Sequence, residues 1–137
     1  MPEGLVPLAL ALRENARPGD TFAVAVPERD YDVVDLGTEI AAISGVPSYV
    51  ARVKEQSTVS EAYAREIERR LALLAAVAGS RDPHEAFAAL RAAGIDWYVV
   101  PVKAPPAFAA GLAGAVASTP AGILYRVPGE ASPRPSS

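Results

Sequence analysis

Cysteine is absent from this chain of 137 residues, and histidine and tryptophan occur once each. Without cysteine the protein forms no disulfide and offers neither a thiolate metal ligand nor a cysteine nucleophile. The single histidine, His84, has no second histidine or cysteine with which to share a zinc ion, so we predict no structural metal site there. A serine hydrolase is not indicated either, because the Gly-x-Ser-x-Gly motif is missing. We expect His84 to be exposed in the first turn of a helix.

Excess positive charge and long apolar runs are also missing. The formal net charge is -3 and the isoelectric point is about 5.1, which indicates no basic surface for nucleic acid. No segment approaches the roughly 20 apolar residues that a transmembrane helix needs. The apolar start, residues 1–12, lacks the basic residues of a secretory signal peptide and is followed directly by Arg13-Glu14-Asn15. We therefore expect the isolated chain to be soluble, with no membrane span.

Glycine-rich phosphate-binding loops are missing as well. The first predicted strand is followed by Pro27-Glu28-Arg29-Asp30, an acidic turn without glycine that would repel a phosphate group. The segment 111–114 contains two glycines, but it lacks the strand–turn–helix context of a phosphate-binding loop. These observations disfavour a dinucleotide cofactor, and we expect the chain to use no cofactor.

Half of the residues are hydrophobic, and they fall into alternating helical and strand patterns. The predicted elements, in chain order, are a helix at 6–16, a strand at 21–26, a short helix at 38–43, a strand at 49–53, helices at 58–79 and 82–93, a strand at 95–102, a helix at 107–114 and a hairpin at 115–127. We predict one α/β domain over residues 1–128, with a small three-layer, Rossmann-like and mostly parallel sheet flanked by helices and a C-terminal β-hairpin. The Pro/Ser-rich tail, residues 129–137, is expected to be disordered.

The strongest local signals lie in the middle of the chain. Thr58-Val59-Ser60-Glu61 forms a capping box at a helix start, and Asp82-Pro83 is typical of a second helix start. Gly94 is expected in the left-handed conformation that ends this helix. The strand that follows is almost continuously apolar, as is typical of a strand covered on both faces. Its aromatic residues, Trp97 and Tyr98, are therefore both expected to be buried.

The long helix should bury one face and expose charged pairs on the other. Its predicted buried stripe consists of Tyr63, Ile67, Leu71, Leu74 and Val77. On the solvent side, the pairs Glu61–Arg65 and Glu66–Arg70 are each spaced four residues apart, which brings opposite charges together. Each pair is expected to stabilise the helix by about 0.2–0.5 kcal/mol.

Four acidic residues follow the first predicted strand: Glu28, Asp30, Asp32 and Asp35. Ligands of open α/β sheets bind beyond the carboxyl ends of strands, and paired carboxylates can hold a hard cation such as Mg²⁺ or Mn²⁺. Many nucleotide-sugar transferases use an Asp-x-Asp segment in this way, and Asp30-Tyr31-Asp32 has that spacing. A solvated polar loop is the preferred interpretation, because two aspartates at this spacing arise by chance in most chains of this size.

Four segments of the chain resemble parts of a known domain. They are 12–20 (Leu-Arg-Glu-Asn-Ala-Arg-Pro-Gly-Asp), 44–49 (Ser-Gly-Val-Pro-Ser-Tyr), 90–100 (Leu-Arg-Ala-Ala-Gly-Ile-Asp-Trp-Tyr-Val-Val) and 122–127 (Gly-Ile-Leu-Tyr-Arg-Val). In this order they are similar to the C-terminal extramembrane domain of polytopic bacterial glycosyltransferases of the GT-C type. The resemblance covers most of residues 5–127.

The resemblance implies a non-catalytic accessory domain, part of a larger protein, on the extracytoplasmic face of a bacterial membrane. In such enzymes the sugar donor is typically a polyprenyl-phosphate sugar, and the catalytic acidic residue lies in a loop between early membrane helices. Asp30-Tyr31-Asp32 does not match that position, so no catalytic residue is carried over. The implied partners are a glycan or a polyprenyl-linked acceptor, met through the parent protein.

The residues leave two other functions open. The first is a stand-alone metal-dependent transferase or hydrolase that uses Asp30 and Asp32 with help from Glu28, although the chain is short for such an enzyme. The second is a cytoplasmic module that oligomerises through an edge strand, for which strand 123–127 is the expected candidate. The preferred prediction is the non-catalytic accessory domain.

Overall fold

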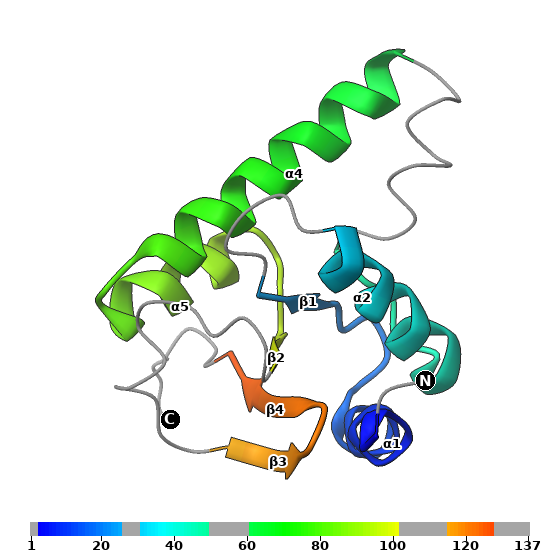
Figure 1. The fold of residues 1–137 in the computed structure, drawn as a ribbon. Coiled ribbons are helices and arrows are strands. Elements are labelled where there is room, and N and C mark those ends of the chain that lie inside the picture. Colours follow the sequence, from blue (N-terminus) through cyan, green and yellow to red (C-terminus); the bar gives the residue numbers. More distant parts are fainter. Residues whose placement is uncertain (1–2, 26–30, 50–60, 102–114, 128–137) are drawn as a thin grey trace.

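The computed structural model describes residues 3–25, 31–49, 61–101 and 115–127. In chain order these residues form α1 (Leu5–Asn15), β1 (Phe22–Val24), α2 (Tyr31–Ser44), α4 (Glu61–Gly79), α5 (Pro83–Ala92), β2 (Trp97–Pro101), β3 (Ala115–Thr119) and β4 (Gly122–Arg126). Together they make a mixed α/β fold, as predicted (Figure 1). None of the described helices is long and apolar enough to cross a membrane.

The described strands form one open sheet in the order β1-β2-β4-β3. β1 and β2 run parallel, whereas β4 runs antiparallel to both β2 and β3. The sheet is therefore mixed, instead of the mostly parallel, Rossmann-like sheet that the sequence predicts. The difference arises because the second strand of the C-terminal hairpin pairs beside β2, which places an antiparallel pair in the middle of the described sheet.

The segment that follows α2 reaches the sheet at the outer edge of β1. Ser48 forms a parallel β-bridge with Phe22. The Phe22 N–H donates to the Pro47 carbonyl at 3.1 Å, and the Tyr49 N–H donates to the Phe22 carbonyl at 2.8 Å. This bridge lies where the sequence predicts the start of a strand at 49–53, of which residues 50–53 fall outside the described part of the chain.

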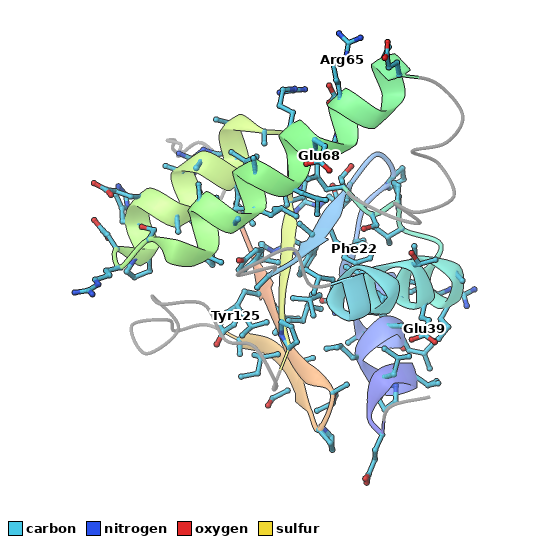
Figure 2. The ribbon with its side chains drawn as sticks, turned by 45° about the horizontal axis from the view of Figure 1, so that its top comes forward. Phe22, Glu39, Arg65, Glu68 and Tyr125 are labelled. Carbon is cyan, nitrogen blue, oxygen red and sulfur yellow. The ribbon has the colours of Figure 1, made fainter. Side chains whose placement is uncertain are left out.

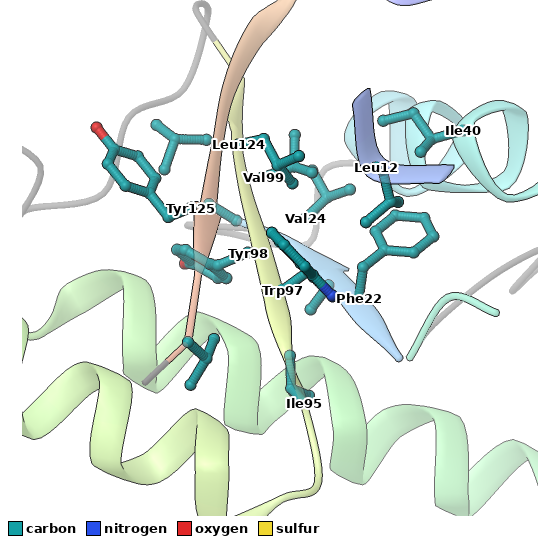
Figure 3. Packing of buried hydrophobic residues seen from close by; sticks show 14 of the residues in the cluster. Leu12, Phe22, Val24, Ile40, Ile95, Trp97, Tyr98, Val99, Leu124 and Tyr125 are labelled. Atoms are coloured by element: carbon teal, nitrogen blue, oxygen red, sulfur yellow. The ribbon is translucent and has the colours of Figure 1, made fainter. Parts of the chain in front are cut away.

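Neighbouring residues of the central strands point to opposite faces of the sheet (Figure 3). Phe22 and Trp97 are register partners and share one face, toward α1, whereas Tyr98 and Tyr125 share the other. On that second face the ring of Phe87 from α5 lies edge-on to Tyr98, with the ring centres 6.1 Å apart. Burial raises the pKa of the Tyr98 hydroxyl, which therefore stays protonated at neutral pH. Helices thus lie against both faces of the sheet.

α1 supplies much of the core on the face that carries Trp97. It packs against α2, β3 and β4. Its Leu5, Leu8 and Leu12 recur on one helix face and are fully buried, and each such side chain contributes about 1.5–3 kcal/mol relative to an exposed position. Gly4 precedes the helix with φ +86°, and a Cβ there would lie 2.7 Å from Pro120 Cδ in the β3–β4 turn. The helix predicted at 6–16 is therefore confirmed.

α2 is longer than the sequence predicts. It begins at Tyr31 and ends at Ser44, whereas the sequence predicts an acidic loop through residue 32 and a helix only at 38–43. Gly37 lies inside the helix, where glycine costs about 1 kcal/mol relative to alanine. The full burial of Ile40 contributes about 1.5–3 kcal/mol in the opposite direction. Packing therefore outweighs the local signal that suggested a loop.

α4 and α5 follow the predicted pattern where they are described. α4 begins at Glu61, the last residue of the predicted capping box, and its Leu71, Leu74 and Val77 are buried as expected. Other predictions fall outside the described residues, namely the capping residues 58–60, the helix at 107–114 and the tail at 129–137. The domain limits of 1–128 therefore stay a prediction.

The predicted start and end of α5 are confirmed. Asp82 Oδ1 accepts a hydrogen bond from the His84 N–H at 2.9 Å, and Pro83 is the first helical residue. The His84 side chain is exposed, as predicted. Gly94 follows the helix with φ +83°, a conformation that side-chain-bearing residues rarely adopt. All five residues of β2 are buried, including its tryptophan and tyrosine, as the sequence predicts.

The C-terminal hairpin of β3 and β4 is also confirmed. Val116 is an extra residue in β3, because Ala115 and Ala117 face the consecutive residues Tyr125 and Leu124. β4 is paired on both sides, so the prediction of a free edge at 123–127 is wrong. On this side of the described sheet the outer strand is β3, and β1 lies at the opposite edge. A bulge in an outer strand hinders edge-to-edge pairing with another chain.

Gly122 at the start of β4 provides a test of this packing. A Cβ at Gly122 would lie 2.7 Å from the Val100 carbonyl oxygen, which is backbone of the paired strand β2. We expect Gly122→Ala to lower the free energy of unfolding by about 1–3 kcal/mol, measured by urea denaturation with Trp97 fluorescence. Gly79→Ala is the control, since a Cβ there meets nothing within 4 Å; it should be neutral or stabilising by up to about 1 kcal/mol. An equal loss in both variants would contradict the close approach.

Candidate functional site

The acidic residues predicted as a metal site fall only partly within the described residues. Asp32 and Asp35 belong to the first turns of α2, not to a loop. Glu28 and Asp30 lie outside the described residues. Where the structure describes the chain, no group of three His, Cys, Asp or Glu side chains could hold a metal ion. A Mg²⁺ or Mn²⁺ site, and the transferase or hydrolase that would use it, stays a prediction.

An open groove of about 660 Å³ lies between α4 and α5, and we call it the α4–α5 groove. Its apolar lining consists of Ala72, Leu73, Ala89, Ala92 and Ala93, and its polar lining consists of Tyr49, Glu66, Arg69 and Arg70. Figure 2 shows the two helices side by side, with Arg65 toward the end of α4 that extends beyond α5. The groove therefore lies beside the middle of α4.

Glu66 binds both arginines of the polar lining. Glu66 accepts hydrogen bonds from Arg69 (Nε to Oε1, 3.1 Å) and from Arg70 (Nε to Oε2, 2.9 Å). Arg69 Nη2 also donates to Glu66 Oε2. These bonds, first of all those from Arg69, lower the pKa of Glu66, and Glu66 in turn raises the pKa of Arg69. Glu66 and Arg69 are therefore both charged at neutral pH.

Arg70 also connects α4 with the segment that follows α2. Its Nη1 donates to the Tyr49 carbonyl oxygen at 2.8 Å, and its guanidinium lies 4.8 Å from the centre of the Tyr49 ring. An exposed guanidinium over an aromatic ring gains about 0.5–1 kcal/mol. Because the Tyr49 N–H is bonded to the carbonyl of Phe22, these contacts tie the polar lining of the groove to the edge of β1.

The lining of the groove has features that suit the binding of a ligand. It combines two cations and an aromatic ring with small apolar side chains, but it contains no nucleophile beside a general base. Small-molecule sites commonly have this composition, in which apolar walls supply contact area and a few polar groups fix the orientation of the ligand.

A second polar cluster lies at the amino ends of β1 and β2. Asp20 Oδ2 accepts one hydrogen bond from the Trp97 indole Nε1 and another from the Arg17 N–H, both at 2.9 Å. The guanidinium of Arg126, at the end of β4, lies 4.3 Å from the centre of the Trp97 ring. The buried indole therefore has a hydrogen-bond acceptor on its polar edge and a cation over its face.

Asp96 joins three strands at the same end of the sheet. Its N–H donates to the Thr21 carbonyl at 2.8 Å, and its carboxylate accepts from the Thr21 N–H at 3.0 Å. The Val127 N–H donates to the Asp96 carbonyl at 2.8 Å. A pocket of about 420 Å³ lies here, lined by Arg17, Asp20, Asp96, Arg126 and Val127. Both carboxylates accept hydrogen bonds from neighbouring protein N–H groups, so this cluster has a structural role.

The four segments that carry the family resemblance meet at this end of the sheet. Segment 12–20 contributes Asp20, segment 90–100 contributes Asp96 and Trp97, segment 122–127 contributes Arg126, and segment 44–49 pairs with Phe22, the register partner of Trp97. Segments 12–20 and 122–127 thus contact the Trp97 indole, and segment 44–49 lies one strand away, at the other edge of β1.

Comparison of the chain with protein-family models, with curated proteins and with solved structures gives no match. The resemblance to the extramembrane domain of GT-C-type glycosyltransferases therefore stays a prediction, which rests on the four sequence segments.

The sequence predicts only part of the α4–α5 groove. Both charged pairs expected on α4 are confirmed, at 3.3 and 2.9 Å. Sequence reasoning missed Arg69, although its position three residues after Glu66 is a recognised spacing for an ion pair. It also missed Tyr49, which comes from a segment 21 residues away from its partner Arg70, and no local pattern connects the two.

Asp20 can be changed without altering the volume of the core. Asp20→Ala leaves the buried Trp97 indole N–H without its acceptor, so we expect a loss of about 1–3 kcal/mol in the free energy of unfolding by urea denaturation. Asp20→Asn keeps an acceptor oxygen in place and should lose less than half as much. A stability of Asp20→Ala equal to that of the unmodified protein would contradict the indole–carboxylate bond.

Removal of one arginine should raise the pKa of Glu66 toward its ordinary value of about 4.3. Hydrogen bonds from Arg69 and Arg70 hold this pKa lower, so the ion pairs stabilise the fold above the ordinary pKa and lose that contribution as the pH falls through the lowered value. In a ¹³C-NMR titration of the side-chain carboxyls, Arg69→Gln should move the Glu66 midpoint upward. Arg65→Gln, whose arginine pairs with Glu61, should leave it in place. An unmoved midpoint in Arg69→Gln would refute the shared ion pair.

Proposed function

We propose that this chain is a non-catalytic accessory domain of a GT-C-type glycosyltransferase-like membrane protein, on the extracytoplasmic face of a bacterial membrane. In this role it binds a glycan or a polyprenyl-linked acceptor that the parent protein handles, or it contacts a partner of that protein. The observation that carries the proposal is that the four resembling segments lie together at one end of the sheet, two of them in contact with the Trp97 indole.

This meeting supports the proposal because segments that match a domain by chance need not touch one another. Here two of the contacts depend on the residue types that make up the resemblance. The indole of Trp97 needs an acceptor, which Asp20 supplies, and its ring face attracts the guanidinium of Arg126. A shared fold therefore explains the four segments better than four separate coincidences do.

A binding role is also supported by the chemistry of the two polar clusters. At the amino ends of the strands, Asp20 and Asp96 accept hydrogen bonds from protein N–H groups. In the α4–α5 groove, the polar side chains are two arginines, a glutamate and a tyrosine. Neither cluster resembles the paired acid and base of a hydrolase or transferase. We therefore expect catalysis to take place in another part of the parent protein.

The sequence of the gene upstream of the Met1 codon tests the proposal. We expect the reading frame to continue upstream and to encode several apolar segments, each of at least about 20 residues, because only such segments span a bilayer as helices. A ribosome-binding site and an in-frame stop codon immediately before Met1 would overturn the proposal, since the chain would then be a free-standing protein.

A further inference from the structure

We infer that the α4–α5 groove binds an acidic saccharide, that is, a sugar ring that carries a carboxylate or a phosphate group. The choice of a sugar rests on the proposed function, whereas the anionic group and the apolar contact follow from the groove itself. The anionic group of the ligand lies at Arg69 and Arg70, and its ring lies against the alanines of the apolar lining.

The two arginines are held in position before a ligand arrives. The side chains of consecutive helix residues, such as Arg69 and Arg70, point about 100° apart. The carboxylate of Glu66, one turn earlier, nevertheless accepts hydrogen bonds from both guanidinium groups. These bonds and the one to Tyr49 use Nε and Nη2 of Arg69 and Nε and Nη1 of Arg70. No bond between the described residues uses Arg69 Nη1 or Arg70 Nη2, so these groups can donate to the oxygens of a carboxylate or phosphate, the anions that guanidinium geometry matches.

Local charge favours an anion at this place although the whole chain is acidic. Two guanidinium groups and one carboxylate give the polar lining a single positive charge, whereas the chain carries a formal net charge of -3. The side chain of Arg69 is 71% exposed and that of Arg70 is 38% exposed, so both can be reached from solvent. A ligand with one negative charge neutralises the cluster, and a cation is repelled by it.

The apolar lining fits one face of a sugar ring. Ala72, Ala89, Ala92 and Ala93 end at Cβ, so a ligand can approach both helices closely between their side chains. A pyranose ring presents a face of C–H groups beside its hydroxyls, which can lie against such a surface. The groove volume of about 660 Å³ falls within the range of about 300–1,000 Å³ for small-molecule sites.

Titration of the ¹⁵N-labelled chain, followed by NMR, tests the inference. The ligands are digalacturonic acid, its neutral counterpart galactobiose, glucose 6-phosphate and inorganic phosphate. We expect saturable shifts of amides in α4 and α5 beside the groove with digalacturonic acid or with glucose 6-phosphate, and the arm that binds more tightly identifies the carboxylate or the phosphate. Galactobiose should bind at least about tenfold more weakly, because it lacks the group that the arginines recognise.

Matched variants on α4 locate the site. Arg69→Gln should weaken binding by about tenfold or more, as loss of a charge-assisted hydrogen bond does. Arg65→Gln is the control, because Arg65 is similarly exposed, at 76%, but lies outside the groove lining; it should change affinity by less than about twofold. Ala72→Leu should fill the groove and also weaken binding, whereas Ala76→Leu, at an exposed position outside the lining, should not.

Three results would overturn the inference: inorganic phosphate binds as tightly as the acidic saccharides, Arg65→Gln weakens binding as much as Arg69→Gln, or no acidic saccharide gives a saturable shift. None of these results tests whether the chain is part of a larger membrane protein, because that question is answered by the gene sequence upstream of Met1. Conversely, saccharide binding by a chain whose gene stands alone would support the groove and overturn the proposed function. The two failures are therefore distinguishable.

Discussion

The hydrogen bond between the Asp20 carboxylate and the Trp97 indole is the contact on which the arrangement of the sheet depends. Trp97 begins β2, which is paired with β1 on one side and with β4 on the other, and its side chain is fully buried. A buried indole N–H without an acceptor costs about 1–3 kcal/mol. By accepting this bond, Asp20 ties the turn before β1 to the start of β2, next to the backbone ladder that holds the two strands in parallel register.

The two polar clusters differ in what their charged groups do. At the amino ends of the strands the carboxylates of Asp20 and Asp96 accept hydrogen bonds from other parts of the fold, so their role is to hold the strands together. In the α4–α5 groove the shared Glu66 accepts hydrogen bonds from two guanidinium groups that line a space of about 660 Å³. The structural cluster and the proposed ligand site thus involve different charged residues.

The parts of the fold that have strong local signals could be predicted from the sequence. Asp82, Pro83 and Gly94 mark the ends of α5 by their own conformational preferences, and the apolar run after Gly94 identifies β2. The start of α2 could not be predicted, because the burial of Ile40 outweighs the loop-like sequence near the beginning of the helix. The antiparallel pairing of β4 with β2 could not be predicted for a similar reason, since contacts between distant segments decide where β4 pairs. The groove likewise depends on Tyr49, which only tertiary structure brings to α4.

The most direct test of this account is the hydrogen-exchange rate of the Trp97 indole N–H. The chain has one tryptophan, so its indole gives a single, unambiguous NMR signal. A fully buried indole bonded to Asp20 at 2.9 Å should exchange with solvent far more slowly than the indole of the unfolded chain in urea. Exchange at the rate of the unfolded chain would contradict the account, because the indole would then be neither buried nor bonded to Asp20.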